Sequence, residues 1–264
     1  MKKIVLLTSD SLRHKYLANQ LAKSFYITLI VTEKKSKKIE DTTALSEEDS
    51  IFVSSHFNKR FHSEKLFFRD FFFPLESRHL VINHKEINSE HIFKEIYKEK
   101  PDRIILFGTS IIKGSILSQF NGKIINLHLG LSPYYKGSAT NLFPIVYNEF
   151  SCVGATIHIA TAKVDQGAIL HQLRPQIDQF DNLHDIGNKV IKEAGEVLPF
   201  VVKKHIEDAT IGVIQKSEGK IFRIKDLTVV LLKKAYDNIA KGMVKDYIRV
   251  KEVLDLEYPI INLK

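Results

Sequence analysis

The chain has 264 residues, 44% of them hydrophobic and 27% charged, a composition that allows a globular fold with a sizeable core. Its single cysteine, Cys152, excludes an internal disulfide framework and a cysteine-based metal cluster, and no stretch approaches the roughly 20 consecutive apolar residues of a membrane span. The net charge is +8, but no zinc-ligand spacing or RNA-binding signature accompanies the basic residues, so we expect no nucleic-acid partner. The single cysteine makes the reducing cytoplasm the expected location, and the absence of a long apolar stretch implies no membrane partner.

The N-terminal part of the chain predicts a strand, a helix and a second strand. Residues 4–7 are apolar, residues 12–25 repeat apolar side chains at helical spacing, and residues 27–32 are rich in β-branched side chains. A strand–helix–strand order implies parallel pairing and an α/β sheet. The turn at 8–11 holds no glycine, which argues against a dinucleotide-binding fingerprint and against a P-loop.

The start of this first helix is a candidate binding position for substrate. Donors in the first turn of a helix can bind a phosphate, which makes Ser9 and Arg13 candidate substrate-binding residues. The alternative is that the polar residues 13–15 form the exposed side of the helix. The basic run at 34–38 is interpreted as a solvated loop, with a surface for an anionic substrate as the alternative.

The remaining pattern alternates between helices and strands as far as about residue 205. We expect irregular structure over 33–55, a phenylalanine-rich helix packed in the core over 57–73, and a helix capped by Ser89 before a strand at 103–108. Further expected elements are strands at 123–127, 153–159 and 168–174, helices at 139–147 and 180–205, and a small hairpin region over 212–224. Residues 227–240 are compatible with either a strand or a helix.

Three polar residues stand where strands give way to loops. Asn126 and His128 are two apart at the end of an apolar strand, so their side chains point to the same face, and Asp165 lies in the turn after a later strand. An amide can donate to a developing oxyanion, an imidazole can move a proton near neutral pH, and a carboxylate can fix the imidazole's tautomer. Because no serine or cysteine nucleophile stands in a recognisable turn nearby, direct attack by a substrate group is the simpler mechanism. The alternative is a structural His–Asp pair.

Two motifs in this order resemble the folate-dependent formyltransferase family, which includes glycinamide ribonucleotide, methionyl-tRNA and amino-sugar formyltransferases. The first is Asn126-Leu127-His128 followed by Leu131, Pro133 and Lys136-Gly137, and the second runs from Val153 to His158 and from Val164 to Leu170. The resemblance implies a Rossmann-like, mostly parallel sheet flanked by helices. We accordingly expect a catalytic domain over 1–208 and a small C-terminal extension over 209–264.

The resemblance also implies roles for individual residues. Formyl would pass from 10-formyltetrahydrofolate to a primary amine, with Asn126 stabilising the oxyanion, His128 assisting proton transfer and Asp165 orienting His128. The folate would be held by two loops, represented by Thr109, Ser110, Ile111, Ile112, Ala160 and Val164. Tyr134 and Lys136 are candidate contacts to the acceptor, with loop packing and an exposed lysine as the alternatives, whereas His158 is interpreted as a hydrogen-bonded, partly buried residue of its strand.

Departures from the family pattern narrow the acceptor. The glycine-rich phosphate turn of glycinamide ribonucleotide enzymes is replaced by Thr8-Ser9-Asp10-Ser11, and the usual serine after the histidine motif is Gly130. Methionyl-tRNA enzymes carry a C-terminal domain of about a hundred residues, for which too few residues follow the last long helix here. An amino sugar, nucleotide-linked or a nonulosonic-acid precursor, remains by elimination. The alternatives are a formyltetrahydrofolate hydrolase, although its usual N-terminal regulatory domain is not expected here, and a non-catalytic binding protein. Residues 220–264 could pack against the acceptor cleft or mediate a homodimer.

Overall fold

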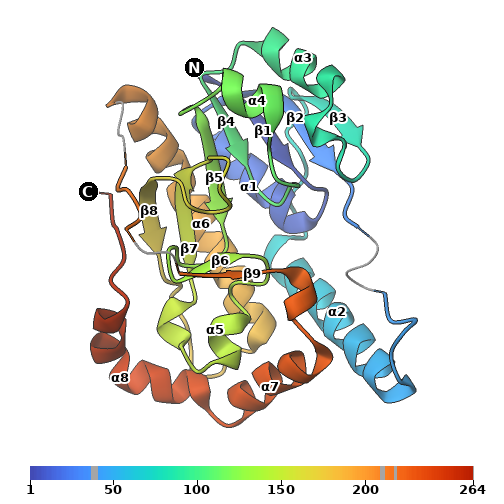
Figure 1. Ribbon diagram of the computed structural model, residues 1–264, viewed down its shortest axis with the longest axis vertical. Helices are drawn as coiled ribbons and strands as arrows, with labels where there is room; N and C mark the ends of the chain where they lie inside the picture. Colours follow the sequence, from blue (N-terminus) through green and yellow to red (C-terminus); the bar gives the residue numbers. More distant parts are fainter. Residues whose placement is uncertain (37–40, 209–211, 217–218, 264) are drawn as a thin grey trace.

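The computed structural model describes residues 1–36, 41–208, 212–216 and 219–263, and its centre is a seven-stranded sheet with the order β3-β2-β1-β4-β5-β7-β8 (Figure 1). The strands are β1 (Lys3–Thr8), β2 (Tyr26–Glu33), β3 (Arg78–Ile82), β4 (Arg103–Leu106), β5 (Ile124–His128), β7 (Ala155–Ile159) and β8 (Ile169–Leu173). The first five strands of this order pair in parallel, while β7 pairs antiparallel with β5 and with β8. The expected α/β fold with a mostly parallel sheet is therefore confirmed.

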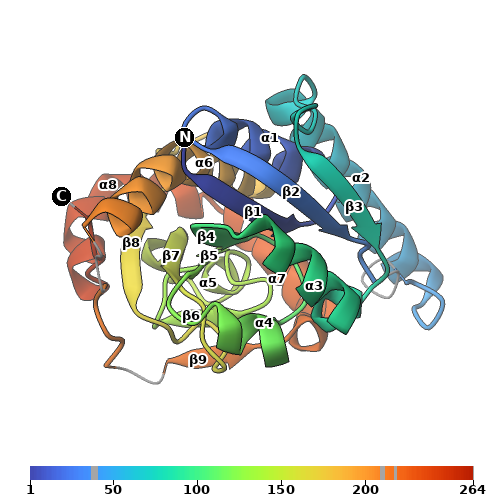
Figure 2. The ribbon, with the colours of Figure 1, turned by 90° about the horizontal axis from the view of Figure 1, so that it is seen from above.

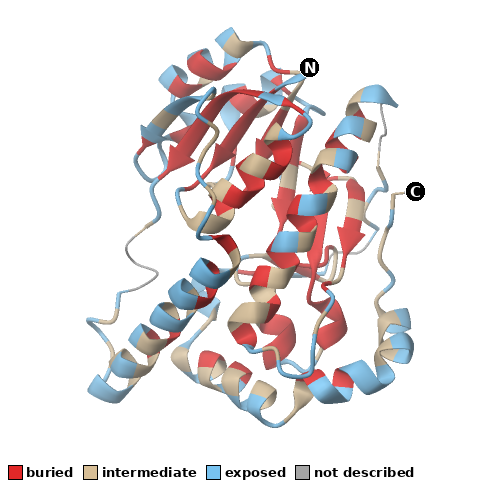
Figure 3. Cartoon of the chain, turned by 180° about the vertical axis from the view of Figure 1, so that it is seen from behind, coloured by how far each residue is buried: buried red, intermediate tan, exposed pale blue. Residues whose placement is uncertain are grey.

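Helices cover both faces of the sheet (Figure 2). On β1, Ile4 and Leu6 point into a core shared with α1 (Leu12–Ala22), α2 (Glu47–Phe68) and α6 (Leu183–Glu207). The alternate residues Val5 and Leu7 point into a second core under α3 (Glu90–Glu99) and α4 (Gly114–Gln119). Strands buried on both faces read as continuous apolar runs, which is why the inner strands were visible in the sequence. Figure 3 shows these strands buried and much of α2 and α8 exposed.

The last strand and the last two helices lie at the lower end of the molecule (Figure 1). A two-stranded parallel sheet joins β6 (Tyr135–Gly137) to β9 (Lys220–Phe222), followed by α7 (Val229–Ala240) and α8 (Met243–Glu257). Helix α7 contacts α5 (Phe143–Val146), and α8 contacts the short turn η3 (Phe150–Cys152). The backbone of Ile261 exchanges hydrogen bonds with Gln172 on β8, so this segment is tied to the sheet edge. The division at residues 208 and 209 stays a prediction.

Several expected elements differ from the structure. The phenylalanine-rich helix begins at Glu47 rather than at residue 57, because Ser46 caps it by accepting from the Asp49 N–H and three acidic residues follow in its first turn. The helix ends at Phe68 rather than at residue 73, and Phe68 is the buried ring among the phenylalanines over 57–73, whereas Phe61 and Phe72 are more than half exposed. The edge strand β3, whose residues are largely exposed and whose apolar run is only the three residues 80–82, was not predicted.

The predicted hairpin over 212–224 is wrong. Its second half, β9, pairs with β6 instead of with a neighbouring strand, and Val213 forms an isolated bridge with Ile169 on β8. Residues 229–240 form helix α7, and only residues 143–146 of the helix expected over 139–147 are α-helical. Within the described part of the chain, no helix has the length and the apolar content that a membrane crossing requires.

Candidate active site

Strand β5 and the turn after β7 bring four polar side chains together at one edge of the sheet. On β5, Asn126 pairs across to His158 on β7, and His128 lies two residues further along. The turn after β7 then places Asp165, in a left-handed backbone conformation (φ 49°) that aspartate tolerates better than most residues, between the two histidines. The three residues predicted from the sequence therefore converge, together with His158, which was not assigned to the site.

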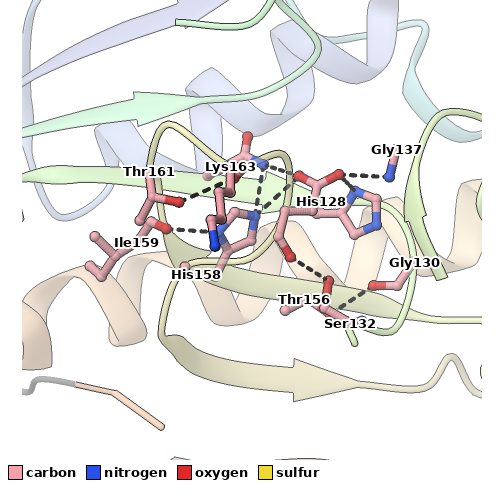
Figure 4. A network of polar contacts seen from close by, with 12 residues as sticks. His128, Gly130, Ser132, Gly137, Thr156, His158, Ile159, Thr161 and Lys163 are labelled. Carbon is pink, nitrogen blue, oxygen red and sulfur yellow. Dashed lines mark hydrogen bonds and ion pairs between the residues drawn. The ribbon is translucent and has the colours of Figure 1, made fainter. Parts of the chain in front are cut away.

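The carboxylate of Asp165 is the centre of this group. Its Oδ2 lies 3.3 Å from His128 Nδ1 and accepts a 2.8 Å hydrogen bond from the Gly137 N–H (Figure 4). Its Oδ1 lies 3.3 Å from His158 Nε2 and accepts from Asn126 Nδ2 at 3.3 Å. Burial alone would raise the pKa of Asp165, but attraction to His128 and His158 when these rings are protonated, together with the Gly137 N–H, lowers that pKa well below its usual value. The group is therefore ionised at neutral pH.

His128 is held as a neutral imidazole with its proton on Nε2. Nε2 lies 2.9 Å from the Tyr135 carbonyl oxygen, which can only accept, so Nε2 carries the hydrogen and Nδ1 presents its lone pair to Asp165. Burial lowers the pKa of His128, and this outweighs the opposite effect of Asp165 and of the Tyr135 carbonyl. A proton arriving at Nδ1 would convert a lone pair facing a carboxylate into a charge-assisted hydrogen bond. The geometry is thus suited to taking up a proton.

Asn126 donates to two acceptors in this structure. His158 Nδ1 lies 2.9 Å from the Ile159 carbonyl, so this nitrogen carries the hydrogen and Nε2 accepts from Asn126 Nδ2 at 3.0 Å. The second amide hydrogen points to Asp165 over the longer 3.3 Å contact. An oxygen of a ligand would therefore reach the amide most easily by replacing Asp165. His158 orients the amide, a role that its own strand pattern did not reveal.

The loop between β5 and β6 is fixed to the sheet by buried hydrogen bonds. Thr156 Oγ1 donates to the Gly130 carbonyl at 2.7 Å and accepts from the Ser132 N–H at 2.9 Å (Figure 4). A Cβ at Gly130 would stand 2.7 Å from both His128 Nε2 and Thr140 Oγ1, so no side chain fits at this position. This close contact favours glycine at this position, where the family pattern has a serine.

A scan against protein-family models matches the formyl transferase family over residues 1–202. The chain belongs to this family. Among curated relatives, methionyl-tRNA formyltransferase of Finegoldia magna is 29% identical over 154 residues, which are 53% of this chain and 49% of that protein. The chain spans about half or less of the length of the first curated relatives that it matches.

Solved structures of low sequence identity share the fold. A sugar N-formyltransferase from Shewanella sp FDAARGOS_354 superposes with a TM-score of 0.57 at 16% identity, covering 90% of this chain and 88% of that one. The formyltransferase PseJ from Anoxybacillus kamchatkensis, solved with UDP-4,6-dideoxy-4-formamido-L-AltNAc and tetrahydrofolate, gives a TM-score of 0.53 at 20% identity over 91% and 97% of the two chains. These likenesses establish the fold of this formyl transferase family member.

The two predicted folate loops of this family member lie beside a surface groove. The groove has a volume of about 420 Å³ and is lined by Gly114, Leu117 and Ser118 of α4, by Asn121 just after this helix, and by Thr161 and Ala162 of the turn after β7. Its lining begins at Gly114, just after the first loop, and includes Thr161 and Ala162 of the second loop. The side chains of Ile112 and Ala160 are buried in one core. Ser110 is already bonded to Glu33 through its N–H and its hydroxyl, and the Ile111 carbonyl accepts from Asn88. Thr109 and Val164 are partly buried.

The predicted acceptor residues lie in more enclosed surroundings than expected. The Arg13 guanidinium and its backbone N–H both bind the carboxylate of Glu64, at 2.5 and 3.0 Å, and the Arg13 and Glu64 side chains are nearly buried. Ser9, four residues before Arg13 in the sequence, is also buried. The alternative of an exposed Lys136 is wrong, because this lysine is completely buried in β6. Tyr134 donates to the Pro259 carbonyl at 3.0 Å.

Proposed function

We propose that this protein transfers a formyl group from 10-formyltetrahydrofolate to the primary amine of an amino sugar. The observation that carries the proposal is the convergence of Asn126, His128 and Asp165 on the scaffold of the formyl transferase family. In this reaction the amine nitrogen forms a bond to the formyl carbon, the bond from that carbon to N10 breaks, the amine loses a proton, and N10 gains one as tetrahydrofolate leaves. The residues must therefore stabilise a developing oxyanion and accept a proton.

His128 and Asp165 would handle the proton. The lone pair of His128 Nδ1 lies 3.3 Å from Asp165 Oδ2, and the Tyr135 carbonyl holds the other ring nitrogen as a donor. The proton of the attacking amine would move to Nδ1, where the ionised Asp165 stabilises the resulting imidazolium. Because the pKa of His128 is lowered, the neutral imidazole is available as a base at neutral pH. Protonation of this ring would remove the base, and with it the activity, once the pH falls below the usual histidine range.

Asn126 would stabilise the negative charge on the formyl oxygen. Its amide nitrogen is held at the end of β5 by His158, and its longer contact to Asp165 can be exchanged for a ligand oxygen. A donor fixed before the reaction begins costs no reorganisation when charge develops, and such a donor typically contributes about a hundredfold or more to the rate.

The groove between α4 and the turn after β7 fits the folate. Its volume of about 420 Å³ lies within the usual range for small-molecule sites, and it combines apolar and polar lining residues. The backbones of residues 109–112 and 160–164 would hold the pterin ring from the two loops at its edge. The folate supplies the activated formyl group, and the chain's residues position it and manage the proton.

An amino sugar is favoured over a phosphorylated ribonucleotide as the acceptor. A phosphate at the start of α1 would have to compete with Glu64, whose carboxylate already binds the Arg13 side chain and backbone. The likeness to the sugar N-formyltransferase from Shewanella and to PseJ extends over about nine tenths of the chain. The first observation disfavours a phosphate at the start of α1, and the second is consistent with a sugar amine, either nucleotide-linked with its phosphates bound elsewhere or a nonulosonic-acid precursor. A homodimer also stays a prediction.

The test is a transfer assay with the full chain, 10-formyltetrahydrofolate and a panel of amino sugars, free and nucleotide-linked. We expect tetrahydrofolate release that depends on one acceptor and matches the amount of formamide product measured by mass spectrometry. Release of formate and tetrahydrofolate without any amine would identify a hydrolase instead. Folate binding without turnover, measured by calorimetry, would identify a binding protein on the same scaffold.

A further inference from the structure

A short strand outside the main sheet carries both backbone groups that fix the His128–Asp165 pair. Strand β6 supplies the Tyr135 carbonyl, which accepts from His128 Nε2 at 2.9 Å, and the Gly137 N–H, which donates to Asp165 Oδ2 at 2.8 Å. The first contact sets the tautomer of the imidazole, and the second sets the orientation of the carboxylate. Because the two groups are only two residues apart, any displacement of β6 moves both together.

Strand β6 is held by β9, which lies beyond the family-matched residues 1–202. The two strands pair in parallel from Tyr135 with Lys220 to Gly137 with Phe222, and β9 is the strand that pairs with β6 in the described part of the chain. The Phe222 carbonyl accepts from the Ser138 N–H at 2.9 Å. Gly137 has φ +97°, and a Cβ there would stand 2.0 Å from the Phe222 oxygen, so the close approach of the two backbones requires glycine.

The aromatic ring of Phe222 anchors this pairing. The ring is 9% exposed and stacks on Phe143 of α5 and on Tyr135 of β6, with ring centroids 4.1 and 5.3 Å apart. With Cys152 these residues form a small apolar cluster separate from the two cores of the sheet. Phe222 therefore connects β9 both to a helix of the catalytic part and to the residue whose carbonyl binds His128.

We propose that Phe222, through β9, is a positioning residue of the active site that keeps β6 on His128 and Asp165. This inference rests on the catalytic roles proposed above for that pair. The C-terminal segment then acts on the reaction without touching a substrate. Removing the ring loosens β6, frees the Nε2–H of His128 from the Tyr135 carbonyl and allows the second tautomer.

The experiment compares Phe222→Ala with Ile221→Ala in the full chain. Ile221 is the matched control, because it lies on the same strand with its side chain half exposed. We expect Phe222→Ala to lower kcat by about tenfold to a hundredfold, the scale of a small misplacement of catalytic groups, with KM for the folate little changed. Ile221→Ala should keep the wild-type kcat, and Phe222→Leu, which retains apolar volume, should recover part of the loss.

A second readout does not depend on formyl transfer. The ¹⁵N chemical shifts of the His128 ring, assigned with His128→Gln, report which nitrogen carries the proton. We expect a single Nε2–H tautomer in the wild type and in Ile221→Ala, and a mixture in Phe222→Ala. If the alanine variant does not fold, Phe222→Leu decides by the same two measurements.

The inference is overturned by a folded Phe222 variant with wild-type kcat and an unchanged His128 spectrum. If the wild type transfers no formyl group to any acceptor, the proposed function fails, and the spectrum alone decides whether Phe222 controls the tautomer. The two failures are therefore distinguishable.

Discussion

Two pairs of histidines in this protein each flank a third polar side chain, and the chemistry of that third side chain differs between the pairs. At the candidate active site, His128 and His158 flank the carboxylate of Asp165. At the junction of α2, α6 and α7, His56 and His184 flank a phenol instead: His56 Nδ1 and His184 Nε2 lie 3.0 and 2.9 Å from the Tyr236 hydroxyl. His56 is as buried as His128, and His184 is partly buried, so burial alone cannot be what makes a histidine reactive.

The chemistry of the shared group separates the two pairs. A hydroxyl donates to one imidazole and accepts from the other, so the Tyr236 cluster is complete with both rings neutral. Burial and the cations Arg60 and Lys59 lower the pKa of His56 to about 3 and that of His184 to about 4. A carboxylate can only accept, which leaves the lone pair of His128 Nδ1 facing a negative charge until a proton arrives. We infer that the His56–His184 pair stabilises the fold and that the His128–His158 pair, with Asp165, moves a proton.

The largest expected effect is on His128. His128→Ala removes the proton acceptor and should lower kcat by at least about a hundredfold in the formyl transfer assay, the scale of acid–base and oxyanion contributions. The matched control is His184→Ala, which removes an imidazole of the Tyr236 cluster and should change kcat less than about twofold. A folded His128→Ala protein with near wild-type turnover would contradict the distinction between the two pairs.

A smaller effect on turnover is expected at His158. His158→Phe removes the acceptor that orients the Asn126 amide, so kcat should fall by about tenfold, less than for outright loss of an oxyanion donor. His171→Phe, which changes a histidine of the adjacent strand β8, is the control and should retain activity. Equal losses in the two variants would show that general strain in the sheet, rather than the amide contact, limits the rate.

The convergence at Asp165 was predictable because local rules determine two of its partners. Strand alternation puts Asn126 and His128 on one face, and parallel strands place ligand sites at their carboxyl ends. Asp165 was a candidate because it lies in the turn after a later strand, and the order of the two family motifs supported it. His158 was missed because its role depends on β7 running antiparallel beside β5, which sets Asn126 opposite His158. No local pattern in residues 153–159 contains that information.

Elements stabilised by distant contacts were the hardest to predict. Strand β9 has three residues, and its pairing with β6 depends on a glycine and an aromatic stack far away in sequence. The start of helix α2, in contrast, was missed although its signal is local. Its polar first turns resemble a loop, but Ser46 and the acidic residues after it form a capped helix start. That signal was present in the sequence and was outweighed by composition.

The pH dependence of stability sharpens the comparison. Because the pKa values of His56 and His184 in the folded state lie below the usual 6.5, the unfolded chain takes up protons first, and stability present above pH 6.5 is lost as the pH falls toward 4. Each such histidine contributes a slope of up to about 1.4 kcal/mol per pH unit. Urea unfolding at pH 7 and pH 5 should show a smaller loss for His56→Leu/His184→Leu than for the wild type. Parallel losses would place the acid sensitivity elsewhere.

The smallest effect is expected from Tyr236→Phe. The substitution keeps the ring but removes the hydroxyl, which leaves the facing nitrogens of His56 and His184 without their shared partner in a partly buried site. We expect a loss of about 1–3 kcal/mol in the free energy of unfolding at pH 7, with kcat unchanged. The decisive measurement determines the free energy of unfolding and kcat on one preparation. If the phenol hydroxyl only stabilises the fold, its removal lowers the free energy of unfolding and leaves kcat unchanged. A fall in kcat without a fall in stability would mean that the Tyr236 cluster communicates with the catalytic carboxylate, and the division of labour between the two histidine pairs would then be wrong.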